Sequence, residues 1–194
     1  KISVIANMLD VVDNLIIGGG MAYTFVKNNG GTIGDSIFEK DRLSDCGEII
    51  SLAEEKDVTI FLPEDVVVSN EFSNKGIKKI LNVNNIPKGW QGLDIGPITI
   101  SKFENIITKS KTVLWNGPMG VFEMPAFEKG TLAIAKSVVK ATNRGAFSLI
   151  GGGDSVAAIK KFNLQDKVSF ISTGGGAMLE SLEGKRLPGI KALA

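Results

Sequence analysis

The chain has 194 residues, of which 43% are hydrophobic and 22% charged, a composition typical of a globular protein with one sizeable core. Its 22 Lys and Arg residues nearly balance 21 Asp and Glu residues, which excludes a strong overall charge for attracting nucleic acid or an acidic membrane. No apolar run approaches the roughly 20 residues of a membrane span. Cys46 is the only cysteine, so a disulfide framework is excluded and we expect a cytoplasmic protein.

The most restrictive feature of the composition is that it contains no histidine. This excludes Ser-His-Asp and Cys-His nucleophile systems, imidazole metal ligands and the usual base of hydride transfer. Any catalysis would depend on carboxylates, lysines, backbone amides or a metal ion. Phosphoryl transfer from or to an oxygen that is already ionised fits this composition, because it needs no general base.

Hydrophobic periodicity predicts helices and strands that alternate along the chain. We expect helices at 2–12, 21–27, 43–56, 127–140, 155–162 and 177–182. We expect strands at 12–17, 58–62, 66–68, 112–115, 147–150 and 168–171, with a less regular stretch at 69–96. The alternation predicts an α/β fold: a Rossmann-like three-layer α/β/α arrangement with a mainly parallel sheet and helices on both faces.

Four of the predicted strand-to-helix turns are rich in glycine: 18–20, 116–120, 151–153 and 174–176. In a parallel sheet these turns lie at the same carboxyl edge. Glycine lets the backbone approach a ligand closely, and the start of a helix offers unpaired N–H groups and a positive dipole end. A single turn of this kind could equally reflect tight packing of a strand against a helix. Four turns at one edge favour a long anionic ligand such as a nucleotide.

The standard nucleotide-binding motifs are absent from the sequence. No Gly-x4-Gly-Lys-Ser/Thr segment exists, which excludes a P-loop. Tyr23 and Leu179 occupy the positions where a dinucleotide fingerprint would need its third glycine. An oxidoreductase that binds a dinucleotide is therefore disfavoured.

Two carboxylates follow these turns and have alternative interpretations. Asp154 could be the N-cap of the following helix, or could hold Mg²⁺ on phosphate oxygens. Glu123 could be a solvated loop residue, or could accept hydrogen bonds from ribose hydroxyls. Beside an anion-binding edge, we favour the metal role for Asp154.

Six ordered segments together resemble the C-terminal, nucleotide-binding domain of the phosphoglycerate kinase family. They are IIGGGMAYTF (16–25), GWQGLDIGP (89–97), VLWNGPMGVFE (113–123), IGGGDS (150–155), ISTGGGA (171–177) and LEGKRLPG (182–189). The resemblance implies reversible, Mg²⁺-dependent phosphoryl transfer between 1,3-bisphosphoglycerate and ADP, which gives 3-phosphoglycerate and ATP in glycolysis.

The resemblance also implies a division of labour between domains. Residues 1–194 would be the nucleotide-binding domain without its first strand and loop, and the N-terminal domain with the 3-phosphoglycerate site would be absent. We expect a monomer that binds ADP or ATP and is inactive alone. The alternative is a non-catalytic nucleotide-binding module.

Site residues follow from the resemblance by position. The adenine pocket would be formed by Gly19, Gly20, Tyr23, Phe72, Gly92 and Leu93. Other nucleotide contacts would come from Asn116, Pro118, Glu123 (to the ribose), and Gly153 and Ser155 (near the phosphates). Asp154 would hold the metal, and the groups at the transferred phosphoryl would be Lys1, Gly174, Gly175 and Gly176.

Overall fold

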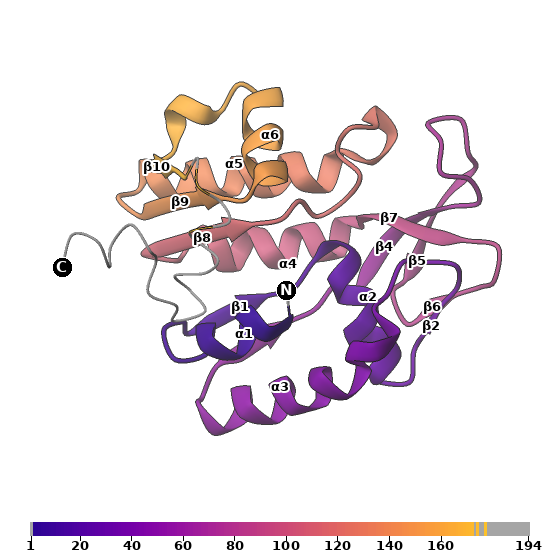
Figure 1. The fold of residues 1–194 in the computed structure, drawn as a ribbon. Helices are drawn as coiled ribbons and strands as arrows, with labels where there is room; N and C mark the ends of the chain where they lie inside the picture. The colour runs from indigo at the N-terminus through magenta and orange to yellow at the C-terminus, as the bar shows by residue number, and fades with distance from the viewer. Residues whose placement is uncertain (1, 173, 175–176, 178–194) are drawn as a thin grey trace.

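The computed structural model describes residues 2–172, 174 and 177, whose arrangement is shown in Figure 1. The helices are α1 (Ile2–Met8), α2 (Gly19–Asn28), α3 (Leu43–Glu55), α4 (Pro97–Ile107), α5 (Lys129–Asn143) and α6 (Gly153–Lys161). The strands are β1 (Asn14–Ile16), β2 (Thr32–Ile33), β3 (Thr59–Phe61), β4 (Asp65–Ser69), β5 (Lys78–Asn82), β6 (Asn85–Ile86), β7 (Gln91–Ile95), β8 (Thr112–Asn116), β9 (Phe147–Gly151) and β10 (Phe170–Ile171). No helix of this described part is long and apolar enough to cross a membrane.

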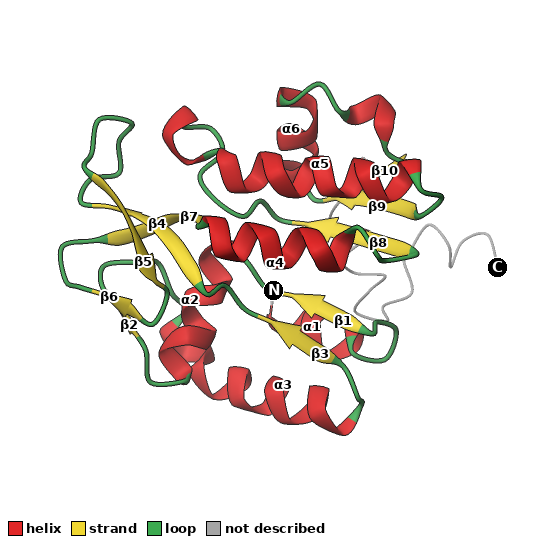
Figure 2. Cartoon of the chain, turned by 180° about the vertical axis from the view of Figure 1, so that it is seen from behind, coloured by secondary structure: helices red, strands yellow, loops and turns green. Residues whose placement is uncertain are grey.

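The central strands are parallel, and the predicted α/β fold is confirmed. Strand β1 pairs with β3, and β8, β9 and β10 form a second parallel group in the order β10-β9-β8. Strand β1 lies on the side of β8 that faces away from β9 (Figures 1 and 2). The predicted helix at 177–182 lies outside the described residues, apart from Ala177.

Two apolar cores attach the helices to the parallel strands. Helices α4 and α5 pack side by side (Figure 2), and together with α6 they cover Trp115 of β8 and Ile150 of β9. Helices α1, α2 and α3 bury a separate core that includes Phe25 and Ile49, against which Leu15 of β1 and Ile60 of β3 pack. Helices therefore lie on both faces of the parallel strands, as the alternating pattern predicts.

An antiparallel unit occupies the stretch that the sequence marks as less regular. Strands β5, β4 and β7 form a sheet in that order, with an irregularity between Val67 and Val68, and β2 and β6 form a short parallel pair beside it. Only part of β4 was predicted. Strand β5 begins with the exposed Lys78 and Lys79 and shows no alternation of apolar and polar residues, so the sequence pattern does not reveal it.

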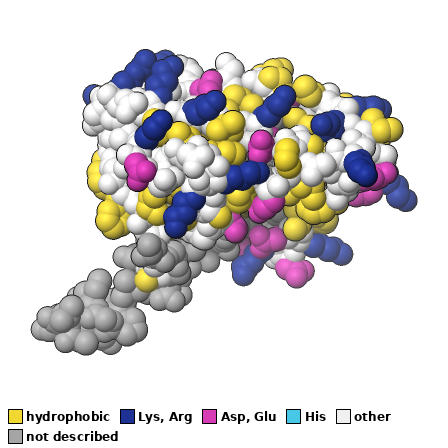
Figure 3. Space-filling view, turned by 90° about the horizontal axis from the view of Figure 1, so that it is seen from above, with side chains coloured by type: hydrophobic (Ala, Val, Ile, Leu, Met, Phe, Trp, Pro, Cys, Tyr) yellow, Lys and Arg dark blue, Asp and Glu magenta, His cyan; other side chains and the backbone are white. Residues whose placement is uncertain are grey.

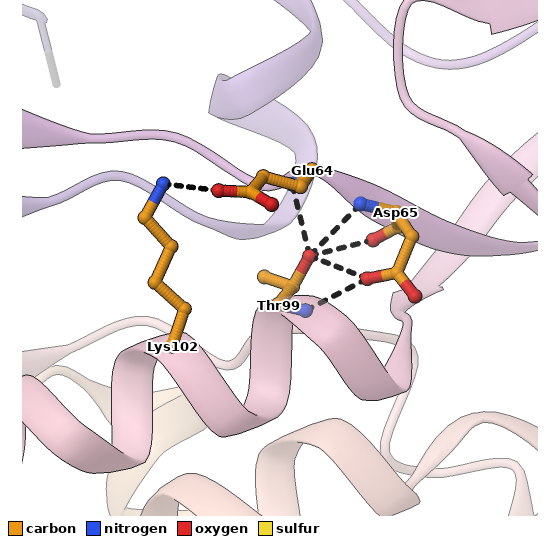
Figure 4. A network of polar contacts seen from close by, with 4 residues as sticks. All are labelled: Glu64, Asp65, Thr99 and Lys102. Carbon is orange, nitrogen blue, oxygen red and sulfur yellow. Dashed lines mark hydrogen bonds and ion pairs between the residues drawn. The ribbon is translucent and has the colours of Figure 1, made fainter.

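Helix α4 also lacks a predicted counterpart, and its N-terminal cap comes from a distant strand. Its own N-cap residue, Gly96, offers no side chain. Instead, the Asp65 carboxylate accepts the N–H groups of Ile98 (3.1 Å) and Thr99 (2.8 Å) across 33 and 34 residues of sequence. Thr99 Oγ1 in turn accepts the backbone N–H groups of Glu64 (2.9 Å) and Asp65 (3.0 Å), as shown in Figure 4. This network fixes the start of α4 on β4.

The same network gives a stability prediction. Replacing Asp65 by alanine leaves buried N–H groups without acceptors, so we expect the free energy of unfolding to fall by about 2–4 kcal/mol. Glu64→Ala is the control, since it removes only the half-exposed ion pair with Lys102. That change should be worth less than about 1 kcal/mol. Urea unfolding curves of the two variants measure both values, and equal losses would contradict the capping role of Asp65.

Candidate functional site

The 116–120 loop, which begins at the last residue of β8, is held by hydroxyl groups from two helices. The Gly117 N–H donates to Ser155 Oγ of α6 at 2.6 Å. The N–H groups of Met119 and Gly120 donate to Thr131 Oγ1 of α5 at 3.1 and 3.2 Å. Three backbone amides of this one loop are thereby tied to helices α5 and α6.

The 18–20 turn lies directly against this loop. A Cβ at Gly18 would overlap the Met119 side chain, and one at Gly19 would stand 2.8 Å from the Pro118 carbonyl oxygen. Gly19 also has a φ of +61°, in the left-handed region that favours glycine. Glycine at position 19 is thus required by the close approach of two backbone segments that are far apart in sequence, whereas Gly18 adjoins a side chain.

The turn after β9 also packs against the 116–120 loop. Gly152 has a φ of +82°, and a Cβ there would lie 2.7 Å from Asn116 Oδ1. The prediction that the glycine-rich turns share one edge is therefore confirmed for the turns after β1, β8 and β9. Of the fourth turn, Gly174 is exposed, whereas Gly175 and Gly176, like Lys1, lie outside the described residues.

Asp154 stands in the first turn of α6 with its side chain exposed. The N-cap alternative is wrong, because α6 begins at Gly153 with Gly152 in the cap position and no side-chain cap bond. The carboxylate has no hydrogen bond or ion pair with another described residue. It is therefore available to a ligand at the edge where the three turns meet.

A buried donor at this edge lacks a partner. Asn116 Nδ2 is enclosed and has no hydrogen-bond partner in the part of the chain that the structure describes. A buried amide without an acceptor costs free energy, and a ligand oxygen would relieve that cost. The atom lies between the loop and the turn that carries Asp154, so the edge fits a ligand rich in oxygen.

The predicted adenine residues lie around the start of α2 and strand β7. Tyr23 is buried, and a Cβ at Gly92 would overlap its ring and hydroxyl, so the two are in direct contact. Burial, together with the nearby Asp94 carboxylate, raises the pKa of Tyr23. Leu93 is also buried, and its carbonyl oxygen accepts the Val121 N–H at 2.9 Å.

Phe72 stands in the exposed turn after β4 and is 59% exposed. This turn is joined to the segment after the 116–120 loop, because Asn74 Oδ1 accepts the Ala126 N–H at 3.1 Å. Glu123 lies in that same segment with its side chain exposed. Both residues are thus on segments that border the candidate site, and both are open to solvent.

Sequence reasoning missed Ile37 as a component of this region. Its side chain is 74% exposed, although isoleucine is usually buried, and its Cγ2 atom would be 3.0 Å from a Cβ at Gly20. An apolar side chain left open beside a glycine-rich turn can form one wall of a pocket for a flat ligand. Two apolar residues after Gly34-Asp35-Ser36, Ile37 and Phe38, were the available signal.

The described residues contain no cluster of three or more acidic or cysteine side chains that could hold a metal ion alone. Mg²⁺ is commonly held by one or two carboxylates together with substrate phosphates. The single exposed carboxylate of Asp154 therefore fits a magnesium ion that arrives with a nucleotide, and does not fit a resident metal centre.

Asp94 is a buried carboxyl that sequence reasoning did not single out. It is 2% exposed and accepts the N–H groups of Gly130 (2.8 Å) and Ile95 (2.9 Å). Burial raises the pKa of Asp94 to about 7, although the two N–H groups lower it. Its position between apolar neighbours in Leu93-Asp94-Ile95 was the signal in the sequence.

The raised pKa makes stability depend on pH. An aspartate in the unfolded chain has a pKa of about 3.9, so between about pH 4 and pH 7 the folded chain keeps a proton that the unfolded chain releases. Raising the pH through this range therefore lowers the free energy of unfolding, by at most about 1.4 kcal/mol per pH unit for one group. We expect Asp94→Asn to reduce this slope, measured by urea unfolding at several pH values.

Asp154→Asn is the control for this experiment. Unlike Asp94, Asp154 is exposed in the folded chain, so this substitution tests whether the removal of any one aspartate changes the slope. A wild-type slope in Asp94→Asn would show that another group causes the pH dependence.

The comparisons with known proteins agree with one another. A family model described as Phosphoglycerate kinase matches residues 1–185. A phosphoglycerate kinase of Porphyromonas gingivalis is 52% identical over 193 residues, which cover 100% of this chain and 46% of that protein. The structure of phosphoglycerate kinase from Coxiella burnetii matches with a TM-score of 0.95 and 44% identity, over 100% of this chain and 49% of that one. The crystal structure of phosphoglycerate kinase from Pyrococcus horikoshii OT3 matches with a TM-score of 0.82 and 31% identity, over 99% of this chain and 48% of that one.

Proposed function

The chain belongs to the phosphoglycerate kinase family, and we propose that it is the nucleotide-binding half of such an enzyme. It spans about half the length of the relatives that it matches. The proposed reaction is reversible phosphoryl transfer between 1,3-bisphosphoglycerate and ADP, which gives 3-phosphoglycerate and ATP. In this proposal ADP or ATP binds along the edge where the turns after β1, β8 and β9 meet.

The observation that carries the proposal is the state of Asn116 and Asp154. One supplies a buried N–H donor without a partner, and the other an exposed carboxylate at the start of a helix. A nucleotide with its magnesium ion satisfies both, because it brings oxygen acceptors and a cation together. The base would then lie toward Gly19, Gly20, Tyr23, Phe72, Gly92 and Leu93, and the ribose toward Glu123.

The proposed chemistry needs no residue to remove a proton. In the direction of ATP formation the attacking group is a phosphate oxygen of ADP, which is already ionised, so the absence of histidine is no obstacle. Bound Mg²⁺ would neutralise charge on the phosphates. The chain's own groups would position the nucleotide, with Asn116 and Pro118 along it and Gly153 and Ser155 near the phosphates. Lys1 and the amides of Gly174, Gly175 and Gly176 are proposed to stabilise the transferred phosphoryl group.

The metal role of Asp154 is testable by substitution. We expect Asp154→Ala to abolish the increase in ADP affinity that Mg²⁺ causes, and to change the free energy of unfolding by less than about 1 kcal/mol, because Asp154 caps no helix. Calorimetric titration of ADP with and without Mg²⁺ measures the affinity.

Asp45→Ala is the matched control, because Asp45 also stands in the first turn of a helix. It should leave the effect of Mg²⁺ intact. A full Mg²⁺ effect in Asp154→Ala would show that the metal is held elsewhere, and no binding of ADP by the unmodified chain would refute the proposed function.

The parallel strands support the proposal that this domain contains one more strand. The backbone of Asp13 and of Ile17, on either side of β1, faces β3. The Asp13 carbonyl oxygen accepts the Thr59 N–H, and the Ile17 N–H donates to the Phe61 carbonyl oxygen. Because successive residues of a strand bond to opposite sides, the backbone of Ile16 faces β8. By the same reasoning Leu114 of β8 faces β1, yet the two strands are not paired among the described residues.

The side chains of β1 and β8 at these facing edges are also incompletely buried. Leu15, Ile16, Val113 and Leu114 are only half-buried, although the strands at the centre of a parallel sheet are normally buried on both faces. A strand between β1 and β8 would pair both edges and cover these side chains. We propose that this strand and an N-terminal domain with the 3-phosphoglycerate site complete the enzyme.

The proposed acid substrate carries several negative charges and would need a cluster of cations. The arginines, Arg42, Arg144 and Arg186, are far apart in sequence. On the face shown in Figure 3, most Lys and Arg side chains lie apart among acidic and apolar ones, and a few lie together at the upper left. The acid site is therefore assigned to the other domain.

We expect the chain alone to show no kinase activity, because in-line transfer needs both substrates held in one geometry. A coupled assay of ATP consumption with 3-phosphoglycerate measures this. Addition of a separately expressed N-terminal domain that includes the proposed strand should restore turnover. Turnover by the purified chain alone would refute the division of sites. Binding of Mg-ADP without turnover in the completed protein would favour the alternative, a non-catalytic nucleotide-binding module.

A further inference from the structure

Thr131 is a buried residue that belongs to none of the expected nucleotide contacts. It lies in the first turn of α5, is fully enclosed, and its Oγ1 atom accepts the N–H groups of both Met119 and Gly120. These N–H groups belong to the end of the 116–120 loop, so one hydroxyl fixes two successive amides.

The position of this hydroxyl is itself fixed from β7. Asp94 Oδ2 accepts the N–H of Gly130, the residue before Thr131, at 2.8 Å. A Cβ at Gly130 or at Gly120 would overlap the Asp94 carboxyl, so the start of α5 and the end of the loop both close on this side chain. Thr131 therefore joins the loop to the strand that carries Gly92 and Leu93.

The other end of the loop carries the proposed nucleotide contacts. Gly117 is tied to Ser155, which leaves Pro118 between an attachment to α6 and the attachment of Met119 to Thr131. A small shift of Met119 and Gly120 would therefore move Pro118, whose carbonyl oxygen lies close to Gly19 of the 18–20 turn.

We propose that Thr131 is a positioning residue for nucleotide binding: its hydroxyl holds the 116–120 loop in the conformation that presents Pro118 to the nucleotide. The inference rests on the proposed function, since it concerns the same site. Thr131 itself makes no contact with the ligand in this proposal.

The experiment compares variants that do and do not keep the hydroxyl. Thr131→Val preserves the shape of the side chain but leaves two N–H groups without an acceptor, so we expect the Kd of Mg-ADP to rise about tenfold. Thr131→Ser and Thr131→Ala both lack the methyl group and differ only in the hydroxyl. We expect the serine variant to bind within about twofold of the unmodified chain, and the alanine variant to bind as weakly as the valine variant.

Thr142→Val is the control for a general loss of stability. Thr142 is in the same helix, and its hydroxyl lies 2.7 Å from Ser148 Oγ and donates to the Val138 carbonyl oxygen, far along α5 from the loop. This variant should lower Tm as Thr131→Val does, while its Kd stays within about twofold. Hydrogen exchange at the amides of Met119 and Gly120 should speed up in Thr131→Val and not in Thr142→Val.

Each outcome decides between a positioning role of Thr131 and a purely structural one. An unchanged Kd in Thr131→Val, or an equal increase in Thr142→Val, would overturn the positioning role while leaving the proposed function intact. If Thr131→Val does not fold, equal Kd values for the serine and alanine variants would overturn it. If the unmodified chain does not bind Mg-ADP, the proposed function and the role of Thr131 both fail.

Discussion

The site depends on one constraint: the turns after β1 and β9 must pack against the 116–120 loop after β8, with no room for a side chain at Gly19 or Gly152. Gly19 and Gly152 both have positive φ, and a Cβ at either would press on Pro118 or Asn116. Since parallel strands bring their carboxyl ends to one edge, this crowding follows from the fold. The hydroxyls of Ser155 and Thr131 then bind the loop amides that this packing would otherwise leave without acceptors.

This packing changes how the glycines are interpreted. From sequence, a glycine-rich turn favours close approach of backbone to a ligand, with packing as the alternative. At Gly18 and Gly19 the structure shows the alternative directly, because these residues face Met119 and Pro118. The ligand interpretation therefore rests on other groups at the edge, Asn116 Nδ2 and the Asp154 carboxylate, and not on the glycines themselves.

The sequence predicted best where local periodicity and burial agree. Strands β8 and β9 and helices α5 and α6 appear close to their expected bounds, because each has an apolar face and a glycine-rich start or end. Helix α4 was missed although Pro97 stands at its start, and its cap from Asp65, 33 and 34 residues away, could only come from the structure. From the sequence alone Asp154 could be an N-cap or a metal ligand, and only the structure shows that it is exposed and caps no helix. Asp94 and Thr131 escaped notice because their roles depend on contacts between β7, α5 and the loop.

The edge of β8 connects the binding site to the proposed missing strand. Because Lys111 O bonds to β9 and alternate residues face opposite sides, the backbone of Asn116 faces β1, like that of Leu114. Asn116 is thus the residue at which an unpaired strand edge and an unpartnered side-chain donor coincide. A strand inserted between β1 and β8 would hold the backbone of Asn116 from one side while Ser155 and Thr131 hold the loop from the other. Completion of the sheet would then order the site before the nucleotide arrives, which lowers the entropic cost of binding.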